Sequence, residues 1–142
     1  WLWPNVDAGS DDVSKGIRSF REKNNTINMR FYRNFSPEDY ICLLANAKCI
    51  VGNSSSGLRE CAFLGTPCVN IGSRQEGREK SDNVIDVNHD SNKIYEAINY
   101  QIKHGKYKKS NIVGDGKSGK KIANYLATCK TNIQKKIHYI KE

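Results

Sequence analysis

The chain has 142 residues, a formal net charge of +8 at pH 7 and 37% hydrophobic residues. A chain of this length fits one domain and can bury a hydrophobic core, which excludes a disordered chain. No apolar run approaches the roughly 20 residues that a membrane-spanning helix needs, so we expect no membrane partner. Because the chain opens on Trp1 rather than Met, we expect a fragment whose first strand is truncated.

Lysines supply most of the positive charge in the last third of the chain. A basic balance can indicate nucleic acid or acidic lipid as a partner. These lysines are spread around predicted helices with few aromatic residues arranged for base stacking, so a solvated lysine-rich surface is the better interpretation. We expect no nucleic-acid partner, and a basic nucleic-acid-binding module stays open as an alternative that only the lysines support. The same field would favour a small anionic ligand.

The cysteines form no metal-binding spacing such as C-x-x-C, and their number is odd. Most of them lie inside apolar runs. This pattern predicts buried free thiols in a reducing cytoplasm, and no metal site. The residues concerned are Cys42, Cys49, Cys61, Cys68 and Cys129.

The first third of the chain alternates between strand and helix patterns. Residues 2–3 are typical of the end of a strand, and apolar residues at helical spacing predict an amphipathic helix over 10–24. A short strand is expected over 28–32. Ser36 followed by Pro37 and two acidic residues is typical of a helix start.

The middle of the chain carries three short apolar runs, which predict strands over 49–51, 68–71 and 84–87. A helix is expected over 56–64, ended by Gly65 in the position after the last helical residue. Further helices are predicted around Ile94–Ile102, Ile122–Cys129 and Ile133–Ile140.

Strands this short and apolar, separated by helices, indicate an α/β fold: a Rossmann-like parallel sheet with helices on both faces. Ligands of such folds bind beyond the carboxyl ends of the strands. The loops expected at that edge are 4–5, 34–35, 52–57 and 72–74.

The segment GNSSSG, residues 52–57, permits three interpretations. A nucleophile elbow would read G-x-S-x-G, but Ser56 stands where the second glycine belongs, and no histidine has an obvious claim to be the base. A helix cap needs only one serine. An anion site would use all three serines, because N–H groups and hydroxyls at a helix start favour a phosphate. Glu60, about a turn further on, suits the hydroxyls of a ribose, unless it is a plain surface residue.

Two other features carry less information. Residues 114–119 match G-x-G-x-x-G, and 114–121 nearly match a phosphate-binding loop, but Lys121 stands where that loop needs Ser or Thr. We interpret this stretch as a turn that starts the next helix. Arg74 and Arg78 flank a polar loop and could bind phosphate, or could belong to a solvated surface.

Three segments together resemble the hydrolysing UDP-N-acetylglucosamine 2-epimerases: Pro4–Ser10 (PNVDAGS), Gly52–Glu60 (GNSSSGLRE) and Gly65–Arg78 (GTPCVNIGSRQEGR). The likeness is greatest to the branch that feeds synthesis of sialic-acid-type sugars. Tyr-Gly-Asp-Gly is typical of that branch, and residues 113–116 are similar. The wider family often has Asp-Ser-Gly-Gly where this chain has residues 53–56, which also favours the sialic-acid branch.

The resemblance implies two Rossmann-like domains of the glycosyltransferase-B type with the active site between them. Residues 1–142 would be the second, C-terminal nucleotide-sugar-binding domain, without the N-terminal domain that carries the catalytic carboxylates. Implied partners are UDP and, as an alternative, GDP, and no cofactor is implied. The nucleotide-binding residues implied are Asn5, Asn34, Ser54, Ser55, Ser56, Glu60 and Arg74, with Asn34 less secure because relatives often have histidine there.

The implied reaction is elimination of the nucleoside diphosphate to leave a glycal, followed by addition of water to release the 2-epimer of the sugar. The full-length protein would be a cytoplasmic homo-oligomeric enzyme, and the present chain alone would be inactive. The alternative function is the donor-nucleotide domain of a glycosyltransferase of the same fold, which should lack an Arg-Gln-x-Gly-Arg loop such as residues 74–78.

Overall fold

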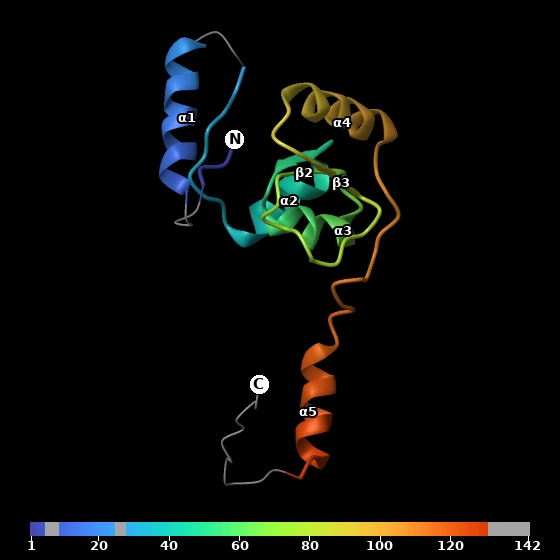
Figure 1. Ribbon diagram of the computed structural model, residues 1–142. Coiled ribbons are helices and arrows are strands. Elements are labelled where there is room, and N and C mark those ends of the chain that lie inside the picture. Colours follow the sequence, from blue (N-terminus) through green and yellow to red (C-terminus); the bar gives the residue numbers. More distant parts are fainter. Residues whose placement is uncertain (5–8, 25–27, 131–142) are drawn as a thin grey trace, which may run out of the picture.

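The computed structural model describes residues 1–4, 9–24 and 28–130. Its centre is a sheet of three parallel strands in the order β1-β2-β3 (Figure 1). These are β1 (Ile50–Gly52), β2 (Cys68–Ile71) and β3 (Val84–Val87). Two strands match the predicted ranges and β1 is shifted by one residue. The α/β fold class predicted from the alternating patterns is therefore confirmed.

The central strand β2 forms the core of the sheet. Val51, Val69 and Ile85 are register partners across the three strands, and Val69 is completely buried. Burial on both sides, which is typical of strands in parallel sheets, applies to β2, whereas Val51 on the edge strand β1 is 43% exposed.

Helices cover both faces of this sheet. The helix α4 (Ser91–His104) lies on one side, and α2 (Pro37–Asn46) and α3 (Glu60–Leu64) lie on the other (Figure 1). The sheet and α4 are joined by Gln101, whose buried Nε2 donates to the carbonyls of Cys68 and Asn83 at 2.8 and 3.0 Å.

The predicted start of α2 is confirmed. Ser36 is the N-cap, and its hydroxyl accepts a hydrogen bond from the Asp39 N–H at 3.1 Å, with Pro37 in the first turn. Leu44 is buried on the inner side of the helix. Its backbone carbonyl accepts from the hydroxyl of Thr66 at 2.9 Å, which joins α2 to the start of β2.

The helix predicted over 56–64 is wrong as one unit. The structure has a 3₁₀-helix, η1 (Ser55–Gly57), and then the short α3. The N–H groups of Leu58 and Arg59 both donate to the Ser55 carbonyl at 3.0 Å, which tightens the first turn. Arg59 then departs from helical geometry, with φ −101° and ψ −76°.

Close packing explains the glycines at the ends of η1 and α3, because neither position has room for a side chain. Gly65 ends α3 in the left-handed region at φ 68°, as predicted, and a Cβ there would meet the backbone carbonyl of Tyr107. A Cβ on Gly57 would meet the sulfur of Cys68. The backbone of η1 therefore lies directly against β2.

The N-terminal part contributes α1 (Ser10–Lys23), close to the predicted helix. The strand expected over 28–32 is reduced to a single parallel bridge between Leu2 and Tyr32. Backbone pairing there consists of two hydrogen bonds: Trp3 N–H donates to Tyr32 O, and Tyr32 N–H donates to Trp1 O, both at 2.9 Å. Two such bonds around one residue make a bridge and not a strand.

The last described helix, α5 (Ser118–Thr128), stands apart from the sheet and has no buried residue (Figure 1). Its predicted apolar residues are exposed, Ile122 by 58% and Leu126 by 62%. The helix expected over Ile133–Ile140 lies outside the described residues. None of the described helices is both long and apolar enough to span a membrane.

The prediction of buried thiols is correct only in part. Cys61 and Cys68 are buried, whereas Cys42 is exposed because it lies on the outer side of α2, away from buried Leu44. Burial, with a smaller contribution from neighbouring acidic groups, raises the pKa of Cys61 and of Cys68 to about 12. The two buried thiols therefore stay protonated at neutral pH.

Candidate functional site

The serine turn, residues 53–57, connects the carboxyl end of β1 to η1. The Ser54 hydroxyl accepts from the Ser56 N–H at 3.3 Å and so caps η1. Ser54 is exposed, and Ser55 and Ser56 are half-buried. Each hydroxyl can also donate a hydrogen bond, since a serine oxygen both donates and accepts. Capping and anion binding are compatible at this turn.

A helix of three residues adds little dipole of its own, because the macrodipole sums over many aligned peptide units. The split of the predicted helix into η1 and α3 therefore weakens one physical reason for an anion at this turn. Positive charge must come from side chains instead. The structure supplies it from another loop.

The β2–β3 loop, residues 72–83, brings arginine to the serine turn. Nη1 of Arg74 donates to the Asn53 carbonyl at 3.2 Å, and Nε2 of Gln75 donates to the same oxygen at 2.7 Å. Arg74 and Asn53 are 21 residues apart in sequence, and Asn53 directly precedes Ser54, so this contact brings the guanidinium to the serine turn. Arg74 is exposed, so its planar fork can also reach a ligand oxygen.

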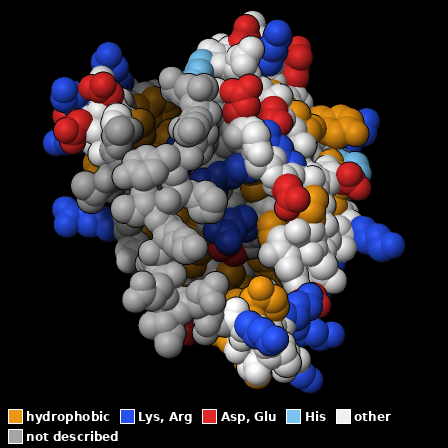
Figure 2. Space-filling view, turned by 60° about the horizontal axis from the view of Figure 1, so that its bottom comes forward, with side chains coloured by type: hydrophobic (Ala, Val, Ile, Leu, Met, Phe, Trp, Pro, Cys, Tyr) orange, Lys and Arg blue, Asp and Glu red, His pale blue; other side chains and the backbone are white. Residues whose placement is uncertain are grey.

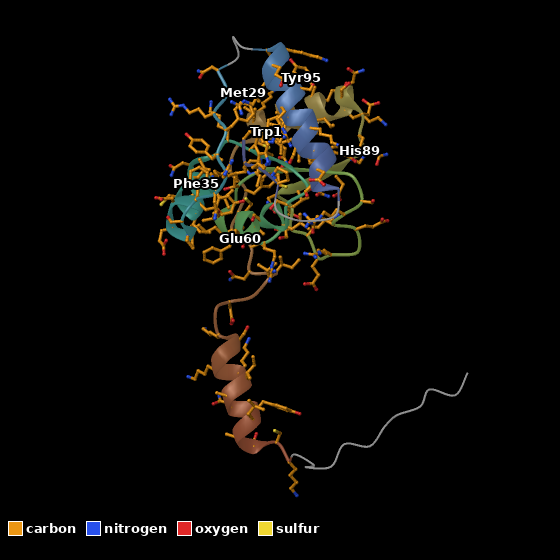
Figure 3. All side chains as sticks on the ribbon, turned by 90° about the vertical axis from the view of Figure 1, so that its left-hand side faces the viewer. Trp1, Met29, Phe35, Glu60, His89 and Tyr95 are labelled. Carbon is orange, nitrogen blue, oxygen red and sulfur yellow. The ribbon has the colours of Figure 1, made fainter. Side chains whose placement is uncertain are left out.

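Glu60 is the first residue of α3 and is half-buried beside the serine turn. Its Oε2 atom is buried and has no hydrogen-bond partner among the described residues. A buried acceptor without a donor is uncommon in folded proteins, and a ligand is one source of the missing donor. Figure 3 shows Glu60 on α3.

The two asparagines expected at the site have different outcomes. Asn34 is exposed, and its Oδ1 accepts from the Phe35 N–H at 2.9 Å. Phe35 lies beside α2 and apart from Glu60 (Figure 3), and no hydrogen bond of the described residues joins Asn34 to the serine turn. Asn5 lies outside the described residues.

A polar group that sequence reasoning missed lies at the same edge of the sheet. Asn70 and Asp86 are register partners on β2 and β3. Asn70 Nδ2 and Lys80 Nζ donate to the two carboxylate oxygens of Asp86, each at 2.7 Å. Partial burial by itself raises the pKa of Asp86, but these hydrogen bonds outweigh it and hold the pKa below its ordinary value. The signal in the sequence was a polar residue within each of two predicted strands, Asn70 in 68–71 and Asp86 in 84–87.

The family is decided by comparison with known proteins. Residues 1–127 match the family model described as UDP-N-acetylglucosamine 2-epimerase. This chain belongs to the UDP-N-acetylglucosamine 2-epimerase family.

Several relatives of this epimerase-family chain are bacterial proteins. It is 35% identical over 127 residues to the UDP-N,N'-diacetylbacillosamine 2-epimerase (hydrolyzing) of Legionella pneumophila, covering 89% of this chain and 33% of the relative. It is 37% identical over 82 residues to the GDP/UDP-N,N'-diacetylbacillosamine 2-epimerase (hydrolyzing) of Campylobacter jejuni, covering 58% and 21%.

A third relative is the polysialic acid biosynthesis protein P7 of Escherichia coli, which is 36% identical over 99 residues, covering 70% of this chain and 25% of the relative. The epimerase-family chain thus spans about a third or less of the length of these relatives.

The alternative chemistry at the serine turn has no support in the described part of the epimerase-family chain. His89 packs against Gly72, and the ring of His104 stacks on Tyr107 at 3.9 Å. Neither has a described hydrogen bond to a serine of the turn, and His138 lies outside the described residues. No group of three or more metal-binding side chains occurs within the described ranges.

The glycine-rich stretch at 114–119 is a turn before a helix, as interpreted from the sequence. Gly114 N–H donates to Asn111 O at 2.9 Å, and Asp115 Oδ1 accepts from the Lys117 N–H at 3.0 Å. The helix α5 begins at Ser118. No described strand leads into this stretch, as a phosphate-binding loop would require.

The surface charge suits an anionic ligand. Figure 2 shows Lys and Arg side chains set back near the middle of one face, with Asp and Glu side chains on the same face. The formal net charge of +8 also raises the local concentration of an anionic counter-ion.

Proposed function

We propose that this chain is the nucleotide-binding part of a hydrolysing UDP-N-acetylglucosamine 2-epimerase, or of a relative that acts on a UDP- or GDP-linked diacetamido sugar. Family membership and the names of its relatives support the reaction class. The observation that carries the proposal is the shared contact at Asn53, whose carbonyl accepts from Arg74 and so holds a guanidinium against the serine turn.

The diphosphate would bind between Arg74 and the hydroxyls of Ser54, Ser55 and Ser56. Each hydrogen bond to a charged phosphate oxygen is worth about 1.5–3 kcal/mol. The guanidinium matches the geometry of a phosphate because its N–H groups lie in one planar fork. Hydroxyls and one cation together can therefore hold a diphosphate without a long helix behind them.

The ribose would bind at Glu60. Its buried Oε2 atom accepts no hydrogen bond from the described residues, and a ribose presents two neighbouring hydroxyl donors. A carboxylate there also repels a phosphate placed too deep, so it would fix the orientation of the nucleotide. The two asparagines, Asn5 and Asn34, would line the rest of the site near the base.

The full-length enzyme would eliminate the nucleoside diphosphate to form a glycal with a C1–C2 double bond and then add water to release the 2-epimer. Carboxylates outside this chain would carry the proton transfers, so we expect no turnover by this chain alone. We also propose that the full-length protein works in the cytoplasm as a homo-oligomer, with this chain as its C-terminal domain of the glycosyltransferase-B type.

The decisive experiment is calorimetric titration of the chain with UDP and with GDP at two salt concentrations. We expect saturable binding of one nucleotide, weakened about ten- to a hundredfold by Ser55→Ala through the loss of one hydrogen bond to a charged oxygen. Ser19→Ala on the exposed surface of α1 is the matched control and should bind like the wild type. Preference for GDP would keep the reaction and change the substrate.

The contrary result is equally clear. Failure of both nucleotides to bind, with binding of an oligonucleotide that falls about tenfold or more over a few-fold rise in salt, would replace the proposal with a basic nucleic-acid module.

A further inference from the structure

The β2–β3 loop has a buried glutamine within its polar, exposed stretch over residues 73–79. Gln75 is 1% exposed, whereas Ser73, Arg74 and Glu76 are exposed. Glutamine is mostly a surface residue, and burying its amide costs free energy unless the amide is hydrogen-bonded. The burial of Gln75 therefore needs a specific partner.

That partner is the backbone of the serine turn. Gln75 Nε2 donates to the Asn53 carbonyl at 2.7 Å, the same oxygen that accepts from Arg74 at 3.2 Å. A backbone carbonyl has two lone pairs and can accept both. Asn53 directly precedes Ser54, so the shared oxygen fixes the distance between the arginine loop and the serines.

The bond from Gln75 is the shorter of the two and comes from the buried partner. Arg74 is a long exposed side chain, and holding such a side chain in one geometry costs conformational entropy, so its bond of 3.2 Å is a weaker anchor for the loop than the buried amide. Gln75 is held by packing on all sides, so its amide can act as a fixed pin. Arg74, the next residue, then starts from a defined backbone position.

The amide oxygen of Gln75 argues against a role in packing alone. Its Oε1 atom is buried and accepts no hydrogen bond from the described residues. An apolar side chain of similar length would fill the same space without leaving an acceptor unsatisfied. The amide is useful at this place because of the hydrogen bond that Nε2 makes.

We propose that Gln75 is a positioning residue for nucleotide binding, which pins the arginine loop to the Asn53 carbonyl so that Arg74 reaches the diphosphate. This inference rests on the proposed function. It assigns Gln75 no contact with the ligand; its effect passes through Arg74.

The test compares Gln75→Met with Gln101→Met. Gln101 is a matched control because it is also buried and also donates from Nε2 to backbone carbonyls, but it lies on α4 against Cys68 and Asn83. For each variant we would measure the affinity for UDP and for uridine by titration, and the unfolding temperature of the same samples. We expect Gln75→Met to keep its unfolding temperature, to bind UDP about three- to tenfold more weakly and to leave uridine binding unchanged.

Gln101→Met should show the reverse: a lower unfolding temperature with unchanged UDP affinity of the folded protein. In an Arg74→Ala background, Gln75→Met should have no further effect on UDP, because the residue acts through that arginine. Gln75→Glu keeps the volume but cannot donate when ionised, and it should reproduce the loss of UDP affinity.

Three results would overturn the inference while the proposed function stands. They are unchanged UDP binding by Gln75→Met, equal losses for UDP and uridine, or additive effects of the Gln75 and Arg74 substitutions. Unfolding of both Gln75 variants would also overturn it, because the residue would then serve packing. Absence of UDP binding by the wild-type chain would instead remove the proposed function, and the inference with it.

Discussion

Asn70 and Asp86 stand opposite each other on β2 and β3, and the Asn70 amide donates to the Asp86 carboxylate at 2.7 Å. Lys80 donates to the other carboxylate oxygen, so the far end of the β2–β3 loop is attached to the sheet through Asp86. The loop that carries Arg74 is thus held at both ends, at Asn53 and at Asp86.

The stability of this attachment should depend on pH. The hydrogen bonds from Lys80 and Asn70 outweigh partial burial and lower the pKa of Asp86 in the folded state. A lowered pKa stabilises the fold above the unfolded value of about 3.9, and this contribution is lost as the pH falls through the lowered value. In urea unfolding, Asp86→Asn should be less stable than wild type at about pH 7, with a gap that closes below about pH 4.

The control for that measurement is Asp82→Asn, an exposed carboxylate in the same loop. It should show no comparable change with pH. A stability gap between Asp86→Asn and wild type that stays constant down to strongly acidic pH would contradict the assignment.

Glu60 should distinguish the ribose from the phosphates. Glu60→Gln removes the carboxylate charge and keeps the shape, so we expect UDP affinity to fall about three- to tenfold through the weaker acceptor. Inorganic pyrophosphate has no ribose, and its affinity should stay equal or rise because a nearby negative charge is gone. Calorimetry with both ligands measures this, and Glu96→Gln on exposed α4 is the control. Parallel losses for both ligands would contradict a ribose role.

Gly65 should tolerate no side chain. Its φ of 68° disfavours other residues, and a Cβ would meet the Tyr107 carbonyl. We expect Gly65→Ala to lower the free energy of unfolding by about 1–3 kcal/mol. Gly16→Ala in α1, where a Cβ meets nothing within 4 Å, should instead raise it by about 0.5–1 kcal/mol. Chemical denaturation of both variants measures the contrast, and similar shifts for the two would refute it.

Alkylation should separate the cysteines. Cys42 is exposed and should react with iodoacetamide in the native protein. Cys61 and Cys68 are buried with pKa values raised to about 12, so they should react only after unfolding. Mass spectrometry of peptides from native and denatured samples gives the order of labelling. Early labelling of Cys61 would show that α3 opens readily.

The sequence allowed good prediction where local pattern decides structure. The strands at 68–71 and 84–87 and the N-cap at Ser36 depend on neighbouring residues, and all are present. The division of the helix over 56–64 depends on the Ser55 carbonyl accepting two N–H groups, a detail of backbone geometry that residue types do not encode.

The candidate site was likewise predictable only where local pattern determines the structure. The serine turn and Arg74 could be named from the sequence because loops after parallel strands meet at one edge of the sheet. The burial of Gln75 could not, since a glutamine between charged residues has the composition of a solvated loop. Asn70 and Asp86 become partners only through strand register. The helix expected around 122–129 is present as α5, but its apolar residues are exposed because no described element packs on them.

A Cβ on Gly57 would meet the sulfur of buried Cys68, so the backbone of η1 packs closely on the central strand of the sheet. Ser55 and Ser56 belong to the same short helix as Gly57, so the backbone that carries their hydroxyls rests on the core of the sheet. A side chain at position 57 would have to displace this turn, and with it the Asn53 carbonyl that accepts from Arg74 and Gln75. The packing of η1 on β2 therefore supports from below the geometry that the Asn53 carbonyl sets at the surface.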